Sequence, residues 1–363
     1  MTQPDHRQTD TTSFSLDDIL ALARKKRALD VYLSAGSHPV IKGHGRFSQL
    51  AQLPVLTQAD IERLVHAVMT AKQKKDVDRQ YNLELMHRTK AAGSTRINLS
   101  ATHDGMAAAC RLLPARPPSF KEIGPEDALK KIATLDRGLI LIAGESNSGK
   151  TTTMAAVVDH INTHLKKTIV TIENPVQFTH RSRSALVMQR EIGVSAHDYN
   201  GSIHTAMRGD IDVLCLDGLD VERDTVDLML DAAESHLVVA THRCFGGAGW
   251  QIRRIFNVFS DDQQDFVQTQ LARVLRATIW QHLVPLKDGT DSKIAMEIMV
   301  STEKIAALIR RNELHKIHAE IGADEEAGMQ TIGDSIKKIN EGSRLVETAF
   351  KLVELAGPLA ALI

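Results

Sequence analysis

Eight consecutive residues, 144–151 (GESNSGKT), are of the types that hold a chain of phosphates. They match the pattern G-x-x-x-x-G-K-[ST] at every fixed position. Gly144 and Gly149 allow the backbone to curl so that successive N–H groups point inward, and a following helix would direct its positive N-terminus to the same point. Lys150 would reach the β- and γ-phosphates, and the Thr151 hydroxyl would complete the coordination shell of Mg²⁺. The sequence therefore predicts a nucleotide-binding loop formed by Gly144, Ser146, Asn147, Ser148, Gly149, Lys150, Thr151 and Thr152.

Such a loop needs a strand before it and a helix after it, and the sequence predicts both. Residues 139–143 form an apolar run of the length of a buried strand. From Thr151 onward, Met154, Val157, Val158 and Ile161 recur at helical spacing. The alternative is an accidental octapeptide in an ordinary loop. The flanking elements favour nucleotide binding over that alternative.

The composition is that of a globular protein without a strong overall charge: 363 residues, 43% hydrophobic and 25% charged, with a formal net charge of -1. The length predicts two domains. The neutral balance argues against a nucleic-acid partner, and the basic runs at 24–27 and 72–75 are interpreted as solvated helix faces. Cys110, Cys215 and Cys244 have no paired or metal-like spacing, which indicates free thiols in a reducing cytosol.

Neither end of the chain predicts a segment inserted in a membrane. The polar start differs from a signal peptide, and no apolar run approaches the roughly 18 residues that span a bilayer. Residues 356–363 contain Gly357 and Pro358 and are interpreted as a docking tail. Residues 344–355 are partly amphipathic, so we expect them to pack on their own domain or a neighbour, with membrane contact as the alternative.

Changes of pattern divide the chain into a tail, two domains and a linker. Residues 1–12 are expected to be disordered, and residues 13–113 to form a small α+β domain. In that domain Ser15 would cap a helix, strands would lie between 30 and 50 and over 82–86, 94–100 and 106–113, and a helix would cover 57–73. Three prolines predict a linker at 114–124, and residues 125–363 are expected to form the second domain, mostly helical after about residue 300.

The second domain alternates strands with helices, which predicts an α/β fold with a parallel sheet covered on both faces. Residues 168–172, 213–216 and 237–240 are largely apolar runs, as strands buried on both faces should be. Ligands of such sheets bind at the carboxyl ends of the strands. Glu173, Asp217, Thr241 and His242 fall at those ends, so we expect them near the phosphate loop.

These motifs together resemble the type IV pilus retraction ATPases (PilT and PilU) within the larger group of secretion ATPases. The resemblance covers nearly the whole chain from Asp17 on. Besides the phosphate loop it rests on the order and spacing of several short segments. These are residues 30–36 (DVYLSAG), 95–98 (TRIN), 110–111 (CR), 118–124 (PSFKEIG), 171–178 (TIENPVQF), 189–193 (QREIG), 206–208 (AMR), 232–237 (AAESHL) and 328–331 (GMQT).

The resemblance implies a ring of six subunits, each with a PAS-like amino-terminal domain and a RecA-like motor domain that binds ATP and Mg²⁺. Such rings lie in the cytoplasm at the inner face of the bacterial membrane and act on a membrane platform protein. The ring would contain this chain alone or be mixed with a related ATPase. Arg96 and Arg111 match basic residues that contribute to the nucleotide's phosphates in that family, with surface salt bridges as the alternative.

Three segments depart from the family, and all three concern hydrolysis. Where the family has IEDPIEF, residues 172–178 read IENPVQF, so only Glu173 stays charged. Where the family ends a strand in Gly-Glu, this chain has Asp217 before a glycine and no glutamate after it. Asp217 would hold the metal through water or approach the nucleophile with a shorter side chain. His242 would replace the family's strand-end histidine after a shift of one residue, or be an ordinary hydrogen-bonded residue.

Two interpretations of these departures remain. In the first, the chain is a slow but working ATPase in which Glu173 or Asp217 orients the attacking water. In the second, it binds nucleotide without useful turnover and assists a competent motor. A DNA-handling ATPase is a third reading, which the neutral charge and the lack of basic loops with aromatic residues argue against.

Overall fold

The fold was analysed in a computed structural model, which describes residues 14–43, 46–80, 82–91, 93–287 and 292–341. The chain divides into two compact units, Met1–Arg116 and Pro117–Ile363. The boundary falls inside the range 114–124 that was expected to be a linker. The second half of that range is helical, because α4 (Phe120–Ile123) begins there and buries Phe120 and Ile123 in the core of the second unit. The expected tail, residues 1–12, the amphipathic segment 344–355 and the expected docking tail 356–363 lie outside the described residues.

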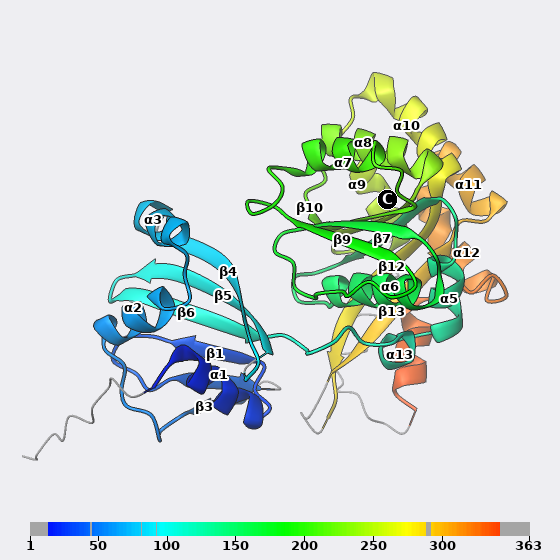
Figure 1. Cartoon of the computed structure of the whole chain (residues 1–363). Helices are drawn as coiled ribbons and strands as arrows, with labels where there is room; N and C mark the ends of the chain where they lie inside the picture. Colours follow the sequence, from blue (N-terminus) through cyan, green and yellow to red (C-terminus); the bar gives the residue numbers. More distant parts are fainter. Residues whose placement is uncertain (1–13, 44–45, 81, 92, 288–291, 342–363) are drawn as a thin grey trace, which may run out of the picture. The chain divides into compact units, whose positions relative to one another are not determined.

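The first unit is a six-stranded antiparallel sheet with helices packed on it, which agrees with the expected α+β class (Figure 1). Its strand order is β3-β2-β1-β6-β5-β4. The strands are β1 (Asp30–Leu33), β2 (Val40–Gly43), β3 (Arg46–Gln49), β4 (Asn82–Thr89), β5 (Gly93–Thr102) and β6 (Gly105–Leu112). The helices are α1 (Leu16–Lys25), α2 (Gln58–His66) and α3 (Ala71–Gln80). The likeness to PAS domains stays a prediction.

The start of α1 was predicted correctly, whereas the helix expected over 57–73 is wrong. Ser15 caps α1 and exchanges hydrogen bonds with Asp18, as a capping box requires. In place of one helix there are two, since α2 ends at His66 and α3 begins at Ala71. The Thr70 hydroxyl and backbone N–H both donate to the side chain of Gln73, which starts the new helix.

The second unit is built on a seven-stranded sheet of order β13-β12-β7-β11-β10-β8-β9. All neighbouring pairs are parallel except β12 and β13. The strands are β7 (Gly138–Gly144), β8 (Thr168–Glu173), β9 (Leu186–Glu191), β10 (Val213–Leu219), β11 (Leu237–Arg243), β12 (Leu275–Pro285) and β13 (Ser292–Val300). The three strands expected at 168–172, 213–216 and 237–240 are thus present, each longer than its apolar run.

Helices cover both faces of this sheet, as Figure 1 shows. One face carries α4, α5 (Glu126–Ala133) and α6 (Lys150–His164), whose apolar residues share a core with Ile140 and Ile142. The other face packs against Leu139 and Leu141. It carries α7 (Tyr199–Met207), α8 (Arg223–Ser235), α9 (Ala248–Phe256), α10 (Asp261–Val274), α11 (Glu303–Arg310), η2 (Leu314–Lys316) and α12 (Ile317–Ala323). Alternate residues of each strand therefore enter two separate cores.

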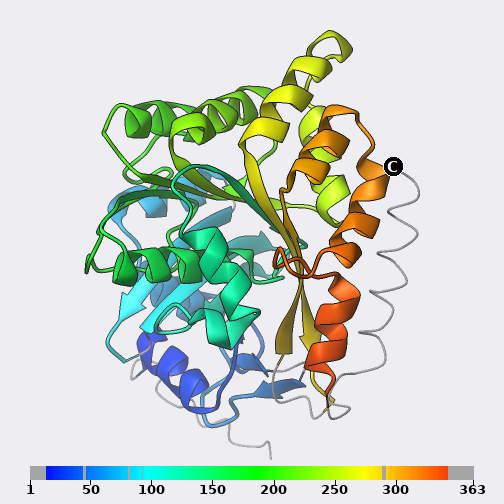
Figure 2. The same cartoon turned by 90° about the vertical axis from the view of Figure 1, so that its right-hand side faces the viewer.

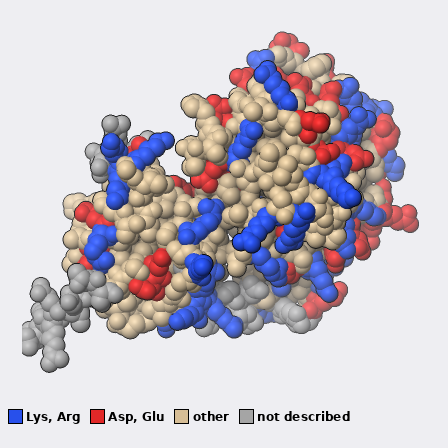
Figure 3. All heavy atoms as spheres, in the orientation of Figure 1, with Lys and Arg blue, Asp and Glu red and all other residues tan. Residues whose placement is uncertain are grey.

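The carboxyl-terminal part is mostly helical after β13, as expected, and Figure 2 shows α11, α12 and α13 (Ile332–Ile339) in orange and red beside the β12–β13 edge. Ile332 and Ile336 of α13 pack against Trp280 and Ala295 of that edge. None of the described helices combines the length and the apolar character needed to cross a bilayer. On the face of the second unit that Figure 3 displays, Lys and Arg are interspersed with Asp and Glu, in keeping with the near-zero net charge.

Candidate functional site

The predicted phosphate loop connects β7 to α6 in the expected order. β7 ends at Gly144, and α6 begins at Lys150 with Gly149 as its N-cap residue. Gly149 has a φ of 91°, and Asn147 has a φ of 65°. A glycine at the first of these positions avoids the strain that a side chain would meet there. The first turn of α6 contains no acidic residue, so its free N–H groups and its dipole favour an anion at this end.

A residue from a distant strand holds the loop in shape. Gln281 of β12 is fully buried, and its side-chain amide donates a hydrogen bond of 2.8 Å to the carbonyl oxygen of Ser148. Its backbone carbonyl lies so close to Gly144 that a Cβ there would be 2.4 Å away. Sequence reasoning missed Gln281, which is 133 positions away along the chain and belongs to no motif of the loop.

The ammonium group of Lys150 lies over the loop. It donates hydrogen bonds to the carbonyl oxygens of Gly144 at 3.1 Å and Glu145 at 2.7 Å. Burial lowers the pKa of Lys150, and the guanidinium of Arg243 lowers it further, while the carboxylates of Asp217 and Glu145 oppose this shift. The lysine is therefore held at the loop by neutral carbonyl groups.

Asp217 at the end of β10 is joined directly to the loop. The Thr151 hydroxyl donates to one of its carboxylate oxygens at 2.8 Å, and the Thr241 hydroxyl donates to the other at 2.5 Å. Burial raises the pKa of Asp217, and these two hydrogen bonds counteract part of that rise. The phenol of Tyr199 donates to its backbone carbonyl. The expected grouping of Asp217 and Thr241 at the phosphate loop is thus present.

Glu173 lies at the end of β8, on the same face of the sheet as Asp217. Its side chain is 3% exposed, and one carboxylate oxygen accepts hydrogen bonds from Thr171 at 2.6 Å and Gln189 at 2.9 Å. Burial raises the pKa of Glu173 to about 7, and the nearby charge of Asp217 adds to that rise. A carboxyl group with such a pKa exchanges protons readily near neutral pH. Asn174, the amide that follows it, is exposed.

His242 does not share this face of the sheet. It is buried on the side of α9, where Gln251 and Arg254 are its neighbours, and neither ring nitrogen reaches hydrogen-bond geometry with a described residue. Burial, with the charge of Arg254 second, lowers the pKa of His242 to about 4. The structure therefore separates His242 from the face that carries Thr151, Asp217 and Glu173, and its catalytic role stays a prediction.

Arg96 and Arg111 belong to the first unit, where they lie opposite each other on β5 and β6. Arg96 is 3.9 Å from a carboxylate oxygen of Glu84, and Arg111 is 3.8 Å from one of Asp30. These contacts agree with the surface salt-bridge alternative. A role toward a nucleotide stays a prediction for both arginines.

The residues fit a Mg²⁺ ion that is bound mainly through a nucleotide. No group of three or more His, Cys, Asp or Glu side chains in the described ranges could hold a metal on its own. Thr151 and Asp217 are hydrogen-bonded oxygen donors beside the loop, and Mg²⁺ in such sites takes one or two protein oxygens together with phosphates and waters. A metal at this position therefore needs the nucleotide as a ligand.

The fold and the site define a P-loop nucleotide-binding domain of RecA-like architecture. One strand, β11, separates the strand of the phosphate loop from the strand that carries Asp217. The family model described as "Type II/IV secretion system protein" matches residues 63–351, and the chain belongs to that family.

Two relatives and one solved structure agree with this membership. The chain is 31% identical to the type IV pilus retraction ATPase PilT of Pseudomonas aeruginosa, over 89% of this chain and 93% of that protein. It is 27% identical to the type IV pilus ATPase PilU of the same organism, over 96% of this chain and 91% of that protein. A crystal structure of the pilus retraction motor PilT with bound ADP is similar with a TM-score of 0.82 and 29% identity, covering 93% of this chain and 96% of that one.

Proposed function

We propose that the protein is a motor ATPase of a type IV pilus or secretion machine that acts in pilus retraction. The hydrogen bond between Thr151 of the phosphate loop and Asp217 of β10 carries this proposal. It joins the residue that would bind Mg²⁺ to the carboxylate that would hold the ion's water shell, as hydrolysis of a nucleoside triphosphate requires. The relatives named PilT and PilU support the cellular role.

In the proposed reaction, the loop N–H groups and Lys150 bind and orient the phosphates. Mg²⁺, held by Thr151 and through water by Asp217, would neutralise charge on the β- and γ-phosphates. Glu173 is the group best suited to accept the proton of the attacking water, because its pKa of about 7 makes it a stronger base than an ordinary carboxylate. Asp217 is committed to two threonine hydroxyls and is better suited to positioning.

The proposal extends to a six-membered ring, of this chain alone or mixed with a related ATPase. The ring would lie in the cytoplasm at the inner face of the membrane and bind a membrane platform protein. The family resemblance supports this arrangement. Arg96 and Arg111 of one subunit would then contribute to the phosphates bound at a subunit boundary.

A nucleotide-binding accessory subunit is the second candidate function. Gly218 follows Asp217 where a catalytic glutamate would be expected nearby, and residues 174 and 177 are amides. This departure would leave binding intact and slow the chemical step.

The test is phosphate release from Mg-ATP together with nucleotide binding on the same samples of wild type, Lys150→Ala and Lys166→Ala. Lys166 is an exposed lysine just after α6 and serves as the matched control. A motor binds and hydrolyses ATP in wild type and the control, and loses both in Lys150→Ala. Binding without turnover, unchanged by Glu173→Gln or Asp217→Ala, would support the accessory subunit instead. Failure of wild type to bind any nucleotide would overturn both.

A further inference from the structure

Arg243 is the last residue of β11 and lies beside the start of the phosphate loop. In the parallel pairing of β11 with β7, Arg243 is the register partner of Gly144. The next residue, Cys244, donates its backbone N–H to the carbonyl oxygen of Gly144 at 3.3 Å. The backbone that carries Arg243 is therefore attached to the loop that would hold the phosphates.

The alternation of β11 places the Arg243 side chain on the same face as the loop's own helix. Val238 packs in the core under α7 to α10, whereas Val239 packs in the core under α6. Thr241 and Arg243 follow Val239 at intervals of two and share its face. The hydrogen bond from Thr241 to Asp217 agrees with this assignment.

The guanidinium of Arg243 has an aromatic neighbour but, in the part of the chain that the structure describes, no carboxylate partner. It lies 5.0 Å from the ring centroid of Phe245, a cation–π contact that restricts its position. Within the described residues, no Asp or Glu forms an ion pair with it. It lies close enough to Lys150 to lower the pKa of that lysine.

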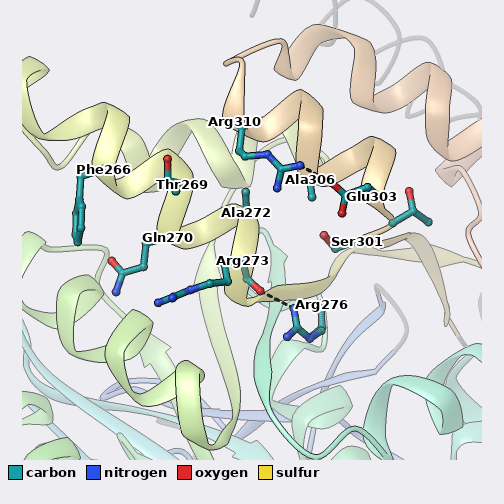
Figure 4. Close-up of a pocket in the computed structure, with 11 residues that line it drawn as sticks. Phe266, Thr269, Gln270, Ala272, Arg273, Arg276, Ser301, Glu303, Ala306 and Arg310 are labelled. Atoms are coloured by element: carbon teal, nitrogen blue, oxygen red, sulfur yellow. Dashed lines mark hydrogen bonds and ion pairs between the residues drawn. The ribbon is translucent and has the colours of Figure 1, made fainter.

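Arginines elsewhere in the same unit behave differently. The hollow in Figure 4, of about 540 Å³, is lined by Arg273, Arg276 and Arg310. Arg310 is paired with Glu303, and Arg276 donates to the backbone carbonyl of Arg273 at 2.8 Å. The side chains of Arg310 and Arg276 are thus each bound to an acceptor close to them in the same unit. Arg243, by contrast, is exposed, and its guanidinium contacts the ring of Phe245.

Two cations held on one side of a phosphate-binding loop repel each other until an anion lies between them. Lys150 already covers the loop, and its hydrogen bonds go to neutral carbonyls. A terminal phosphate brought to the loop carries the negative charge that would satisfy both groups. Its oxygens also match the planar donor geometry of a guanidinium.

We propose that Arg243 binds the terminal phosphate of the nucleotide held by the phosphate loop of the same chain, and so distinguishes a nucleoside triphosphate from a diphosphate. This inference rests on the proposed nucleotide-binding function. Arg243 would act on the nucleotide of its own chain. Its charge would add to the charges of Arg96 and Arg111, which a neighbouring subunit would supply. The charge would be present in every subunit whether or not a ring forms.

The first test measures the equilibrium affinities for ATPγS and ADP, with Mg²⁺, of wild type, Arg243→Ala, Arg243→Lys and Arg137→Ala. Arg137 is an exposed arginine that precedes β7 at the opposite end of the sheet, and it is the control. A lost hydrogen bond to a charged group predicts an ATPγS affinity about 10- to 100-fold weaker in Arg243→Ala. The ADP affinity should stay within about twofold of wild type, because the diphosphate lacks the contacted group. Arg243→Lys should recover part of the loss.

Equal weakening of both ligands in Arg243→Ala, or no weakening of either, overturns the role of Arg243 while leaving the proposed function in place. Wild type that binds neither ligand overturns the proposed function itself. Mixing Lys150→Ala with Arg243→Ala subunits then tests the assignment to the same chain. No triphosphate-specific binding should reappear in the mixture. Recovery of binding at the Lys150-containing subunits would show that Arg243 acts on a neighbour and would overturn the assignment in cis.

Discussion

Replacing Glu173 by glutamine should change how the stability of the second unit depends on pH. Burial raises the pKa of Glu173 from 4.5 to about 7, so the native state binds a proton there more tightly than the unfolded chain does. The stability contributed by the protonated form is therefore fully present below pH 4.5 and is lost as the pH rises through about 7. Glutamine is close in size and cannot ionise, so it removes this dependence.

The magnitude follows from the size of the shift. The rise of the Glu173 pKa from 4.5 to about 7 corresponds to about 3 kcal/mol of unfolding free energy when the whole titration is covered. As the pH rises from 5.5 to 8.5, the ionisation of Glu173 lowers the free energy of unfolding of wild type by about 2 kcal/mol. The side chain is only 3% exposed, so solvent screening removes little of this effect. Over the same pH interval, the free energy of unfolding of Glu173→Gln should rise by about 2 kcal/mol relative to that of wild type.

Urea unfolding followed by tryptophan fluorescence is suited to this measurement. The chain has two tryptophans, Trp250 and Trp280, and both lie in the second unit, so the signal reports that unit alone. The quantity to compare is the change in unfolding free energy between the two pH values, in wild type and in Glu173→Gln. This comparison cancels any constant cost of placing an amide beside Thr171 and Gln189.

A matched control is Glu191→Gln, since Glu191 is also an acid at the end of a strand but is half-buried. This variant separates the effect of a buried carboxyl group from that of losing one acid at a strand end. If the curves of wild type and Glu173→Gln stay parallel from pH 5.5 to 8.5, the pKa of Glu173 is not raised in the folded protein. The argument for Glu173 as a base near neutral pH would then fail with it.

Three further predictions follow from other contacts of the second unit and of the cores. Gln281→Leu leaves a buried carbonyl of the phosphate loop unpaired and should weaken ATP binding about tenfold or more by calorimetry; an unchanged affinity would contradict its role. Gly246→Ala puts a Cβ 2.2 Å from Trp250, so urea unfolding should show a loss of about 1–3 kcal/mol, and an unshifted midpoint would argue against that contact. Burial raises the pKa of both the Cys110 and the Cys215 thiols, so both should resist iodoacetamide at pH 8 until urea is added, as mass spectrometry would report.

The parallel sheet could be predicted because its central strands are continuous apolar runs. Residues 213–216 and 237–240 lie in the interior of the sheet, where both faces are buried. The edge strand β9 was not predicted, because its sequence LVMQRE mixes polar and apolar residues and leaves Leu186 exposed. The break between α2 and α3 was missed for a different reason. It depends on a polar side-chain cap, in which the Thr70 hydroxyl donates to Gln73 at the start of α3.

The phosphate loop could be predicted because its function needs fixed residues at fixed, local spacing. Lys150 and Thr151 lie where the motif requires. Gln281 could not be predicted in this way, since its contact depends on which strand lies beside β7. Strand order is set by long-range packing, which no local pattern in one sequence reveals.

The distinction between His242 and Arg243 depends on a single step of strand alternation. Both residues come at the end of the same apolar run, so the sequence places both near the site. The side chains of a strand alternate between its faces, and a shift of one residue exchanges them. The core assignments of Val238 and Val239 settle the alternation and direct His242 toward α9.

A buried imidazole with a pKa of about 4 is neutral at physiological pH, so it cannot supply positive charge to a phosphate. The neighbouring residue, Arg243, carries a guanidinium, whose planar set of donors suits a phosphate. Positive charge at the end of β11 must therefore come from Arg243.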